Sequence, residues 1–132
     1  MKYLAAILIS LSFISCTQSV TQLSAKIADS DSMAINYFKG DGSMDTVITV
    51  KIIRNKEQIN QLAKMAAGHT ADNYKCGYDG SIHFFKMDKV IQDIDFRMTD
   101  VQCMHFSFML EGKLYATILS PEAKQLLENL RK

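Results

Sequence analysis

The sequence predicts a small α+β domain, in which an antiparallel meander sheet carries two amphipathic helices on one face. Three observations lead to this prediction. Several segments alternate apolar and polar residues, as strands do when only one of their faces is buried. Short turn signals join these segments, which indicates hairpins between neighbouring strands. Two other segments space their apolar residues as helices do, so the expected order of elements is ββ-α-ββββ-α.

The first two expected strands are the β-rich runs AINYFKG and TVITVKIIRN, which are separated by the turn residues DGSMD. In the second run Ile48, Val50 and Ile52 lie on one face, as they would in a half-buried strand. We therefore expect these two strands to pair as a hairpin.

Both expected helices have start signals in the sequence. Asn55 is the expected N-cap of the first helix, with Gln58 three residues later as in a capping box, and Gly68 ends this helix. Ser120 caps the second helix, and Pro121 occupies its first position. The two helices therefore precede and follow the main run of strands.

Four consecutive strands are expected between the helices, joined by tight turns. They are the segments 81–87, 90–98, 103–110 and 113–120. The second of them alternates most clearly, with Phe96 on the buried face and Asp95 on the exposed face. The same alternation in the third strand turns Phe106 inward and His105 outward.

The first 16 residues have the pattern of an export signal. Lys2 provides a positive charge, and an apolar run extends from Tyr3 to Ile14. This run is shorter than the roughly 20 residues that span a bilayer, and its length is typical of a signal peptide. The run ends in the order Phe13, Ile14, Ser15, Cys16. This ending resembles the lipobox of bacterial lipoproteins, in which an apolar residue lies three positions before the cysteine and a small residue lies just before it.

The resemblance implies that Cys16 carries a lipid. A diacylglycerol would be attached to its thiol, the chain would be cut before it, and its new α-amine would be acylated as well. Two or more acyl chains hold a protein firmly on a membrane. No Asp occurs at 17–19, which in lipoproteins implies the outer membrane and leaves the leaflet open. The alternatives are a secreted protein with an incidental cysteine and an anchor that is not cleaved.

The chain then divides into a signal peptide at 1–15, a polar tether at 16–32 that lifts the domain off the membrane, and a single α+β domain at 33–132. The whole chain has 15 Lys and Arg against 14 Asp and Glu. Loss of Lys2 with the signal leaves 14 of each, so the mature chain is formally neutral. Because there is no basic stripe, we expect no nucleic acid as a partner. The expected partners are the membrane, through the N-terminal lipid, and a protein of the cell envelope.

If Cys16 is lipidated, Cys76 and Cys103 remain as a pair. An exported protein is found where disulfides form and persist, so we expect these two to be joined, which would stabilise the fold by about 3 kcal/mol. In the meander the strands beside them lie two spacings apart, roughly 9–10 Å, whereas a disulfide needs Cα atoms within about 7 Å. At least one cysteine must therefore lie beyond its strand. Two free thiols and half a metal site are the alternatives.

Candidate binding residues fall in two places. The loop segment CGYDG offers the Tyr78 ring for stacking and the Asp79 carboxylate, and the alternative is a turn pinned by the disulfide. The second place is the outward face of the meander, for which a plain solvent face is the alternative. Its candidate residues are Ile91, Asp93, Asp95, Arg97, His105 and Met109.

His83 would join His105, Asp93 and Asp95 if it also pointed outward, but the segment SIHFFKM is apolar on both faces and does not fix its direction. Two histidines with carboxylates can bind a metal. No zinc-type spacing of ligands occurs in the sequence, so no metal or other cofactor is predicted. The sequence also contains no serine-hydrolase, P-loop or dinucleotide-binding motif.

These features predict a non-enzymatic lipoprotein that presents a sheet face or loops to a partner. The alternative is an envelope protein that binds a small ligand or a metal through the strand histidines and aspartates.

Overall fold

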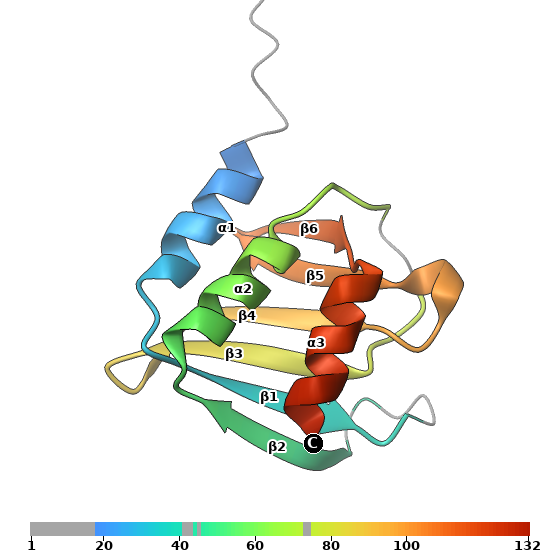
Figure 1. The fold of residues 1–132 in the computed structure, drawn as a ribbon. Coiled ribbons are helices and arrows are strands. Elements are labelled where there is room, and N and C mark those ends of the chain that lie inside the picture. The colour runs from blue at the N-terminus through green and yellow to red at the C-terminus, as the bar shows by residue number, and fades with distance from the viewer. Residues whose placement is uncertain (1–17, 41–43, 45, 73–74) are drawn as a thin grey trace, which may run out of the picture.

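The computed structural model describes residues 18–40, 44, 46–72 and 75–132 (Figure 1). It confirms the α+β class with an antiparallel sheet. The expected order ββ-α-ββββ-α is confirmed, with one further α-helix before it. The elements are α1 (Gln18–Ala28), β1 (Ser32–Phe38), β2 (Val47–Ile53), α2 (Lys56–Ala66), β3 (Gly80–Lys86), β4 (Lys89–Arg97), the short 3₁₀ helix η1 (Val101–Cys103), β5 (His105–Leu110), β6 (Lys113–Ile118) and α3 (Pro121–Arg131).

The six strands form one sheet in the order β2-β1-β3-β4-β5-β6. Every neighbouring pair is antiparallel, and β3 to β6 form the expected meander. The chain leaves the edge strand β2 through α2 and returns as β3 on the other side of β1. This crossing places β3 and β4 in the middle of the sheet.

The three helices pack on the same face of the sheet (Figure 1). α2 and α3 begin at the expected caps, since the side chains of Asn55 and Ser120 accept hydrogen bonds from backbone N–H groups of the first turn. No helix in the described part of the chain is both long enough and apolar enough to cross a membrane. The core lies between the helices and the sheet. Its completely buried members include Leu23, Ile27, Ile35, Ile59, Leu62, Phe84, Phe96, Phe106 and Leu127.

α1 corrects the prediction of a polar tether at 16–32. Leu23 and Ile27 lie one turn apart on this helix and are completely buried in the core. Just beyond the helix, the ammonium group of Lys56 donates a hydrogen bond of 2.5 Å to the carbonyl oxygen of Ser30. The domain therefore includes the helix that precedes residue 33, because Leu23 and Ile27 form an apolar stripe that packs this otherwise polar segment against the core.

Replacement of Leu23 by alanine tests whether α1 belongs to the folded domain. Leu23→Ala truncates a completely buried side chain and should lower the free energy of unfolding by about 2–5 kcal/mol. Gln22→Ala changes an exposed neighbour on the same helix and should have little effect. Urea unfolding of the full chain measures both variants, and equal stabilities would contradict the packing of α1.

Candidate functional site

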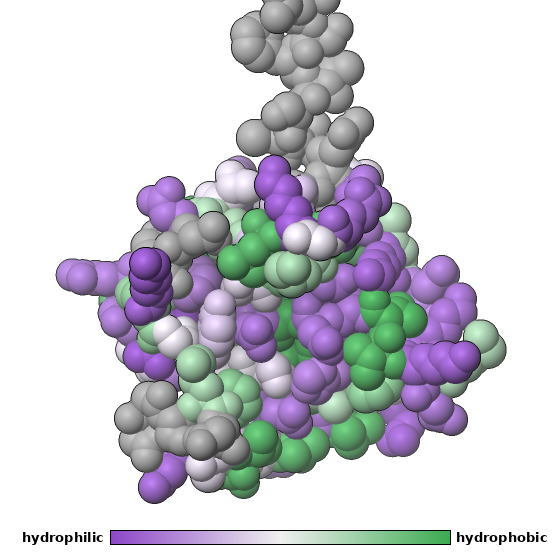
Figure 2. Space-filling view, turned by 180° about the vertical axis from the view of Figure 1, so that it is seen from behind, coloured by the Kyte–Doolittle hydropathy of each residue, from purple (hydrophilic) through white to green (hydrophobic). Residues whose placement is uncertain are grey.

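The face of the sheet opposite to the helices is exposed (Figure 2), and we call it the open face. In Figure 2 polar side chains occupy much of its centre, and apolar side chains gather at its lower border, where β2 lies. On β2 the side chains of Ile48, Val50 and Ile52 are 49%, 55% and 52% exposed. The open face is therefore polar in the middle and apolar along this edge.

One cross-strand row on the open face consists of short or polar side chains. Asn36 pairs with Ser81, Ser81 pairs with Asp95, and Asp95 pairs with Ser107. Ala116 of β6 continues the row beyond Ser107. We call these five residues the central row. Because the partners of Asp95 on both sides are serines, no large side chain of the row covers its carboxylate.

A cleft of about 330 Å³ lies between β4 and β5, beside the central row. The two strands pair around Phe96 and Phe106, whereas the first half of β4 and the second half of β5 are not paired with one another. Gln92 bridges this separation, because its amide nitrogen donates to the carbonyl oxygens of Asp93 (2.9 Å) and Met109 (3.1 Å). The residues of the predicted surface that line the cleft are Tyr78, Ile91, Asp93, Asp95 and Met109.

Asp95 is a half-buried carboxylate of this cleft. Its side chain forms no hydrogen bond or ion pair with any residue that the structure describes. Burial raises the pKa of Asp95 above its ordinary value, the negative charge of Asp93 raises it further, and His83 lowers it in part. Ser107 is 5% exposed, and its hydroxyl also lacks a hydrogen-bond partner within the described ranges. Asp95 and Ser107 are therefore neighbouring polar groups of the cleft whose side chains form no hydrogen bond within the described residues.

His83 points to the open face and connects three neighbouring strands. Its Nδ1 lies 2.5 Å from Oδ1 of Asp93, and its Nε2 lies 3.2 Å from Oγ of Ser81 and 3.1 Å from Nδ2 of Asn36. When the proton is on Nδ1, the ring donates to Asp93 and accepts from the Ser81 hydroxyl and the Asn36 amide. The His83 side chain thus points outward, whereas the sequence did not determine on which face of its strand it lies.

The order serine, histidine, aspartate is also that of hydrolytic triads. Acyl transfer needs, in addition, free N–H donors that stabilise an oxyanion beside the serine. Ser81 is 7% exposed and lies inside β3, whose backbone is hydrogen-bonded to β1 on one side and to β4 on the other. The backbone of β3 beside Ser81 is thus engaged in the sheet, and the side chains of Ser81, Asn36 and Asp93 hold the His83 ring in place.

Asp79 and Arg97 from the predicted binding surface form an ion pair with one another. The Asp79 carboxylate is 4% exposed. It accepts from the Arg97 guanidinium (3.0 Å) and from the backbone N–H groups of Met98 (2.7 Å) and Thr99 (2.9 Å). These bonds fasten the loop before β3 to the end of β4. The prediction that Asp79 offers its carboxylate to a ligand is therefore wrong, and the alternative interpretation as a turn residue holds.

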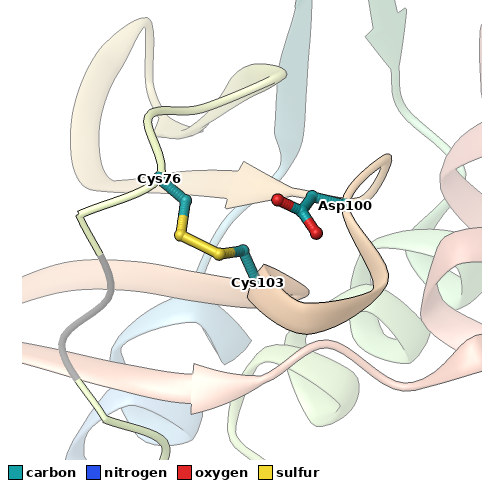
Figure 3. Close-up of side chains that lie close together, drawn as sticks. All are labelled: Cys76, Asp100 and Cys103. Carbon is teal, nitrogen blue, oxygen red and sulfur yellow. A yellow bond between two sulfur atoms is a disulfide. The ribbon is translucent and has the colours of Figure 1, made fainter.

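Cys76 and Cys103 form the expected disulfide (Figure 3). Their Cα atoms are 6.2 Å apart. Cys76 lies in the loop before β3 and Cys103 in η1 before β5, so both lie beyond the strands, as the strand spacing requires. Asp100 lies beside them, and among the described residues these three are the group that could hold a metal ion. Because the two sulfurs are bonded to each other, neither is a thiolate ligand.

His105 corrects the sequence analysis, which placed it on the exposed face. It lies beside Arg97 in the strand register, but it is 1% exposed. Its Nδ1 lies 2.5 Å from the carbonyl oxygen of Cys103, and the centroid of the Tyr78 ring lies 5.7 Å from that of its imidazole. The loop that carries Tyr78 packs against His105, so His105 does not join His83 as an exposed metal ligand.

The central row contains residues that the sequence analysis did not select, namely Asn36, Ser81 and Ser107. The sequence marks each of them only as a small polar residue at an outward position of a strand, which is a weak indication of a binding site. Cys16, the predicted lipidation site, lies outside the described residues.

No protein-family model matches the sequence, and no curated protein or solved structure is significantly similar to it. The functional conclusion therefore depends on the N-terminal sequence pattern and on the geometry of the open face.

Loss of the disulfide should weaken the fold measurably. Cys76→Ser opens the link between the loop and η1 and should lower the free energy of unfolding by about 3 kcal/mol. Urea unfolding with and without a thiol reductant provides the control, because the reductant should destabilise the wild type and leave Cys76→Ser unchanged. The same unfolding midpoint for the oxidised and reduced wild type would contradict a stabilising disulfide.

Asp95→Asn should stabilise the protein at neutral pH. The pKa of Asp95 is higher in the folded protein than in the unfolded chain. Between these two values the folded state binds more protons, so the free energy of unfolding falls as the pH rises through them. Asparagine does not ionise and avoids this loss. We expect a higher Tm for Asp95→Asn than for the wild type at about pH 7, and a smaller difference at about pH 3.

The control is Asp93→Asn, which removes an exposed carboxylate that is already paired with His83. This variant should show no such gain at neutral pH. The other charged or titratable groups near Asp95, which are His83, Arg97, Tyr78 and Lys26, stay the same in the wild type and in Asp95→Asn. Their titration therefore largely cancels in the comparison. A Tm difference that does not depend on pH would contradict the raised pKa.

Proposed function

We propose that this chain is a membrane-anchored, non-enzymatic binding domain of the cell envelope, and that the open face is its binding surface. The observation that carries the proposal is the cleft between β4 and β5, where Asp95 and Ser107 have no side-chain partner among the described residues. A half-buried carboxylate has lost part of its hydration, and a ligand that donates hydrogen bonds to it can replace the lost water. A concave site with convergent polar groups and a perturbed carboxylate is therefore a good candidate for ligand binding.

The proposed anchor is a lipid on Cys16. Since α1 begins at Gln18, only Thr17 separates Cys16 from the folded domain, and the distance from Cys16 to Gln18 is at most about 7 Å. The domain would then stand close to the membrane surface instead of at the end of a long tether. Anchoring would raise the local concentration of the open face for partners on the same membrane.

The geometry of the open face favours binding over metal coordination. A metal site built from His83, His105, Asp93 and Asp95 would need these side chains together, but His105 is buried under the Tyr78 loop. In contrast, Tyr78, Asp93 and Asp95 line one cleft. The lining of this cleft supports the small-ligand alternative, which would use the same site.

Site-specific photo-crosslinking in living cells tests the proposed function. A photoreactive amino acid at Met109 would report on the open face, and one at Gln125, which is exposed on α3, would report on the helical side. We expect a discrete protein adduct from position 109 and none from position 125. Cys16→Ser should abolish this adduct and release the protein from the membrane fraction, whereas the conservative neighbour variant Thr17→Ser should not.

Two results would overturn the proposal. Equal adducts from positions 109 and 125 would show that the open face is not the binding surface. If Cys16→Ser leaves the amount of protein in the membrane fraction and the amount of adduct unchanged from the wild type, the proposed lipid anchor is wrong.

A further inference from the structure

The geometry points to a primary alkylammonium group as the ligand of the cleft beside Asp95. This inference rests on the proposed function of the open face and names the chemistry that the face would recognise. The group could belong to a free aliphatic amine or to a lysine side chain of a partner protein.

Two hydrogen-bond acceptors of the cleft have no hydrogen-bond partner among the described residues. They are the Asp95 carboxylate and the Ser107 hydroxyl. Gln92 also lines the cleft, but its Oε1 is enclosed by the protein and is not counted with them. An ammonium group has three donors and no acceptor, so its hydrogen-bonding capacity complements these groups.

The charges around the cleft also favour a cation. Asp93 is paired with His83, and Arg97 is paired with Asp79, so neither His83 nor Arg97 forms an ion pair with Asp95. Lys26 of α1 lines the cleft as well, but within the described ranges it forms no ion pair. A cationic ligand would supply the ion-pair partner that Asp95 lacks among the described residues, and it would compete with Lys26 for this position.

The walls of the cleft select a cation that carries an aliphatic stem. Met109 is 53% exposed and Leu114 is 47% exposed at this site, and Ile91 lies beside them. The Tyr78 ring, which the disulfide-linked loop brings to the cleft, can attract a cation to its face. The volume of about 330 Å³ lies within the range of small-molecule sites. A bare metal ion would leave these apolar walls unused, and no set of three close ligands is found there among the described residues.

Calorimetric titration of the full-length chain in detergent tests this inference. The probe is n-butylammonium, which reproduces the end of a lysine side chain, and the neutral comparison is 1-butanol. We expect saturable binding of n-butylammonium and no detectable binding of 1-butanol. Asp95→Asn should weaken the binding at least about tenfold, which corresponds to 1.4 kcal/mol.

Two further variants make the test specific. Ser107→Ala removes a hydroxyl from the same site and should also weaken the binding, while Lys26→Ala removes a competing cation and should preserve or strengthen it. Urea unfolding of each variant confirms that it is folded. Equal affinity of the wild type and Asp95→Asn, equal binding of 1-butanol, or binding of Ca²⁺ in place of the amine would each overturn the inference.

Two additional probes distinguish the sources of the ammonium group. 1,5-Diaminopentane represents a free amine, and Nα-acetyl-lysine amide represents a lysine of a protein. Whichever binds more tightly, at a site that depends on Asp95, identifies the source. Failure of all amines, together with an adduct from position 109 in cells, would refute the ligand class and leave the proposed binding function intact.

Discussion

The pairing of Asp95 with Ser81 on one side and with Ser107 on the other places a carboxylate in the middle of a sheet face that no helix covers. Strand alternation directs Phe96 and Phe106 into the core, and the same alternation directs Asp95 and Ser107 outward. The core therefore fixes the site, because a shift of one residue in either strand would exchange the two faces. The chain can bury Asp95 in part, but it supplies no described partner for it.

Two local links keep the surroundings of this carboxylate in place. The Cys76–Cys103 disulfide and the hydrogen bonds of Asp79 both fasten the short loop that carries Tyr78. Gly80 follows directly, and a Cβ atom there would lie 2.3 Å from the carbonyl oxygen of Asn36 and 2.3 Å from the Phe96 ring. The loop thus enters β3 at a point where the backbone approaches its neighbours too closely for a side chain. The disulfide, the hydrogen bonds of Asp79 and the close packing at Gly80 together explain the segment CGYDG better than a direct role of each residue in binding.

The parts of the fold that the sequence predicts are those with a strong local pattern. Alternation reveals the strands, and the caps at Asn55 and Ser120 reveal two helices. α1 escapes prediction because only a short apolar stripe, centred on Leu23 and Ile27, marks it in a polar segment.

Local sequence patterns predict the candidate site less completely than they predict the fold. Alternation places Asp93 and Asp95 correctly, but it also places His105 on the surface, because a local pattern cannot show that a distant loop packs over it. The cleft arises where β4 and β5 cease to pair. Such a separation depends on the packing of the whole sheet, and no single segment encodes it.

The central claim is that Asp95 is an ionisable group on the open face, that the described part of the chain gives it no partner, and that a cation binds to it. An NMR titration of its side-chain carboxyl in the full-length protein, with and without n-butylammonium, tests this claim most directly. The account predicts that the pKa of Asp95 lies above its ordinary value in the free protein and falls when the amine is present, because a bound cation favours the ionised form. An ordinary pKa in the free protein, or a pKa that does not respond to the amine, would contradict it.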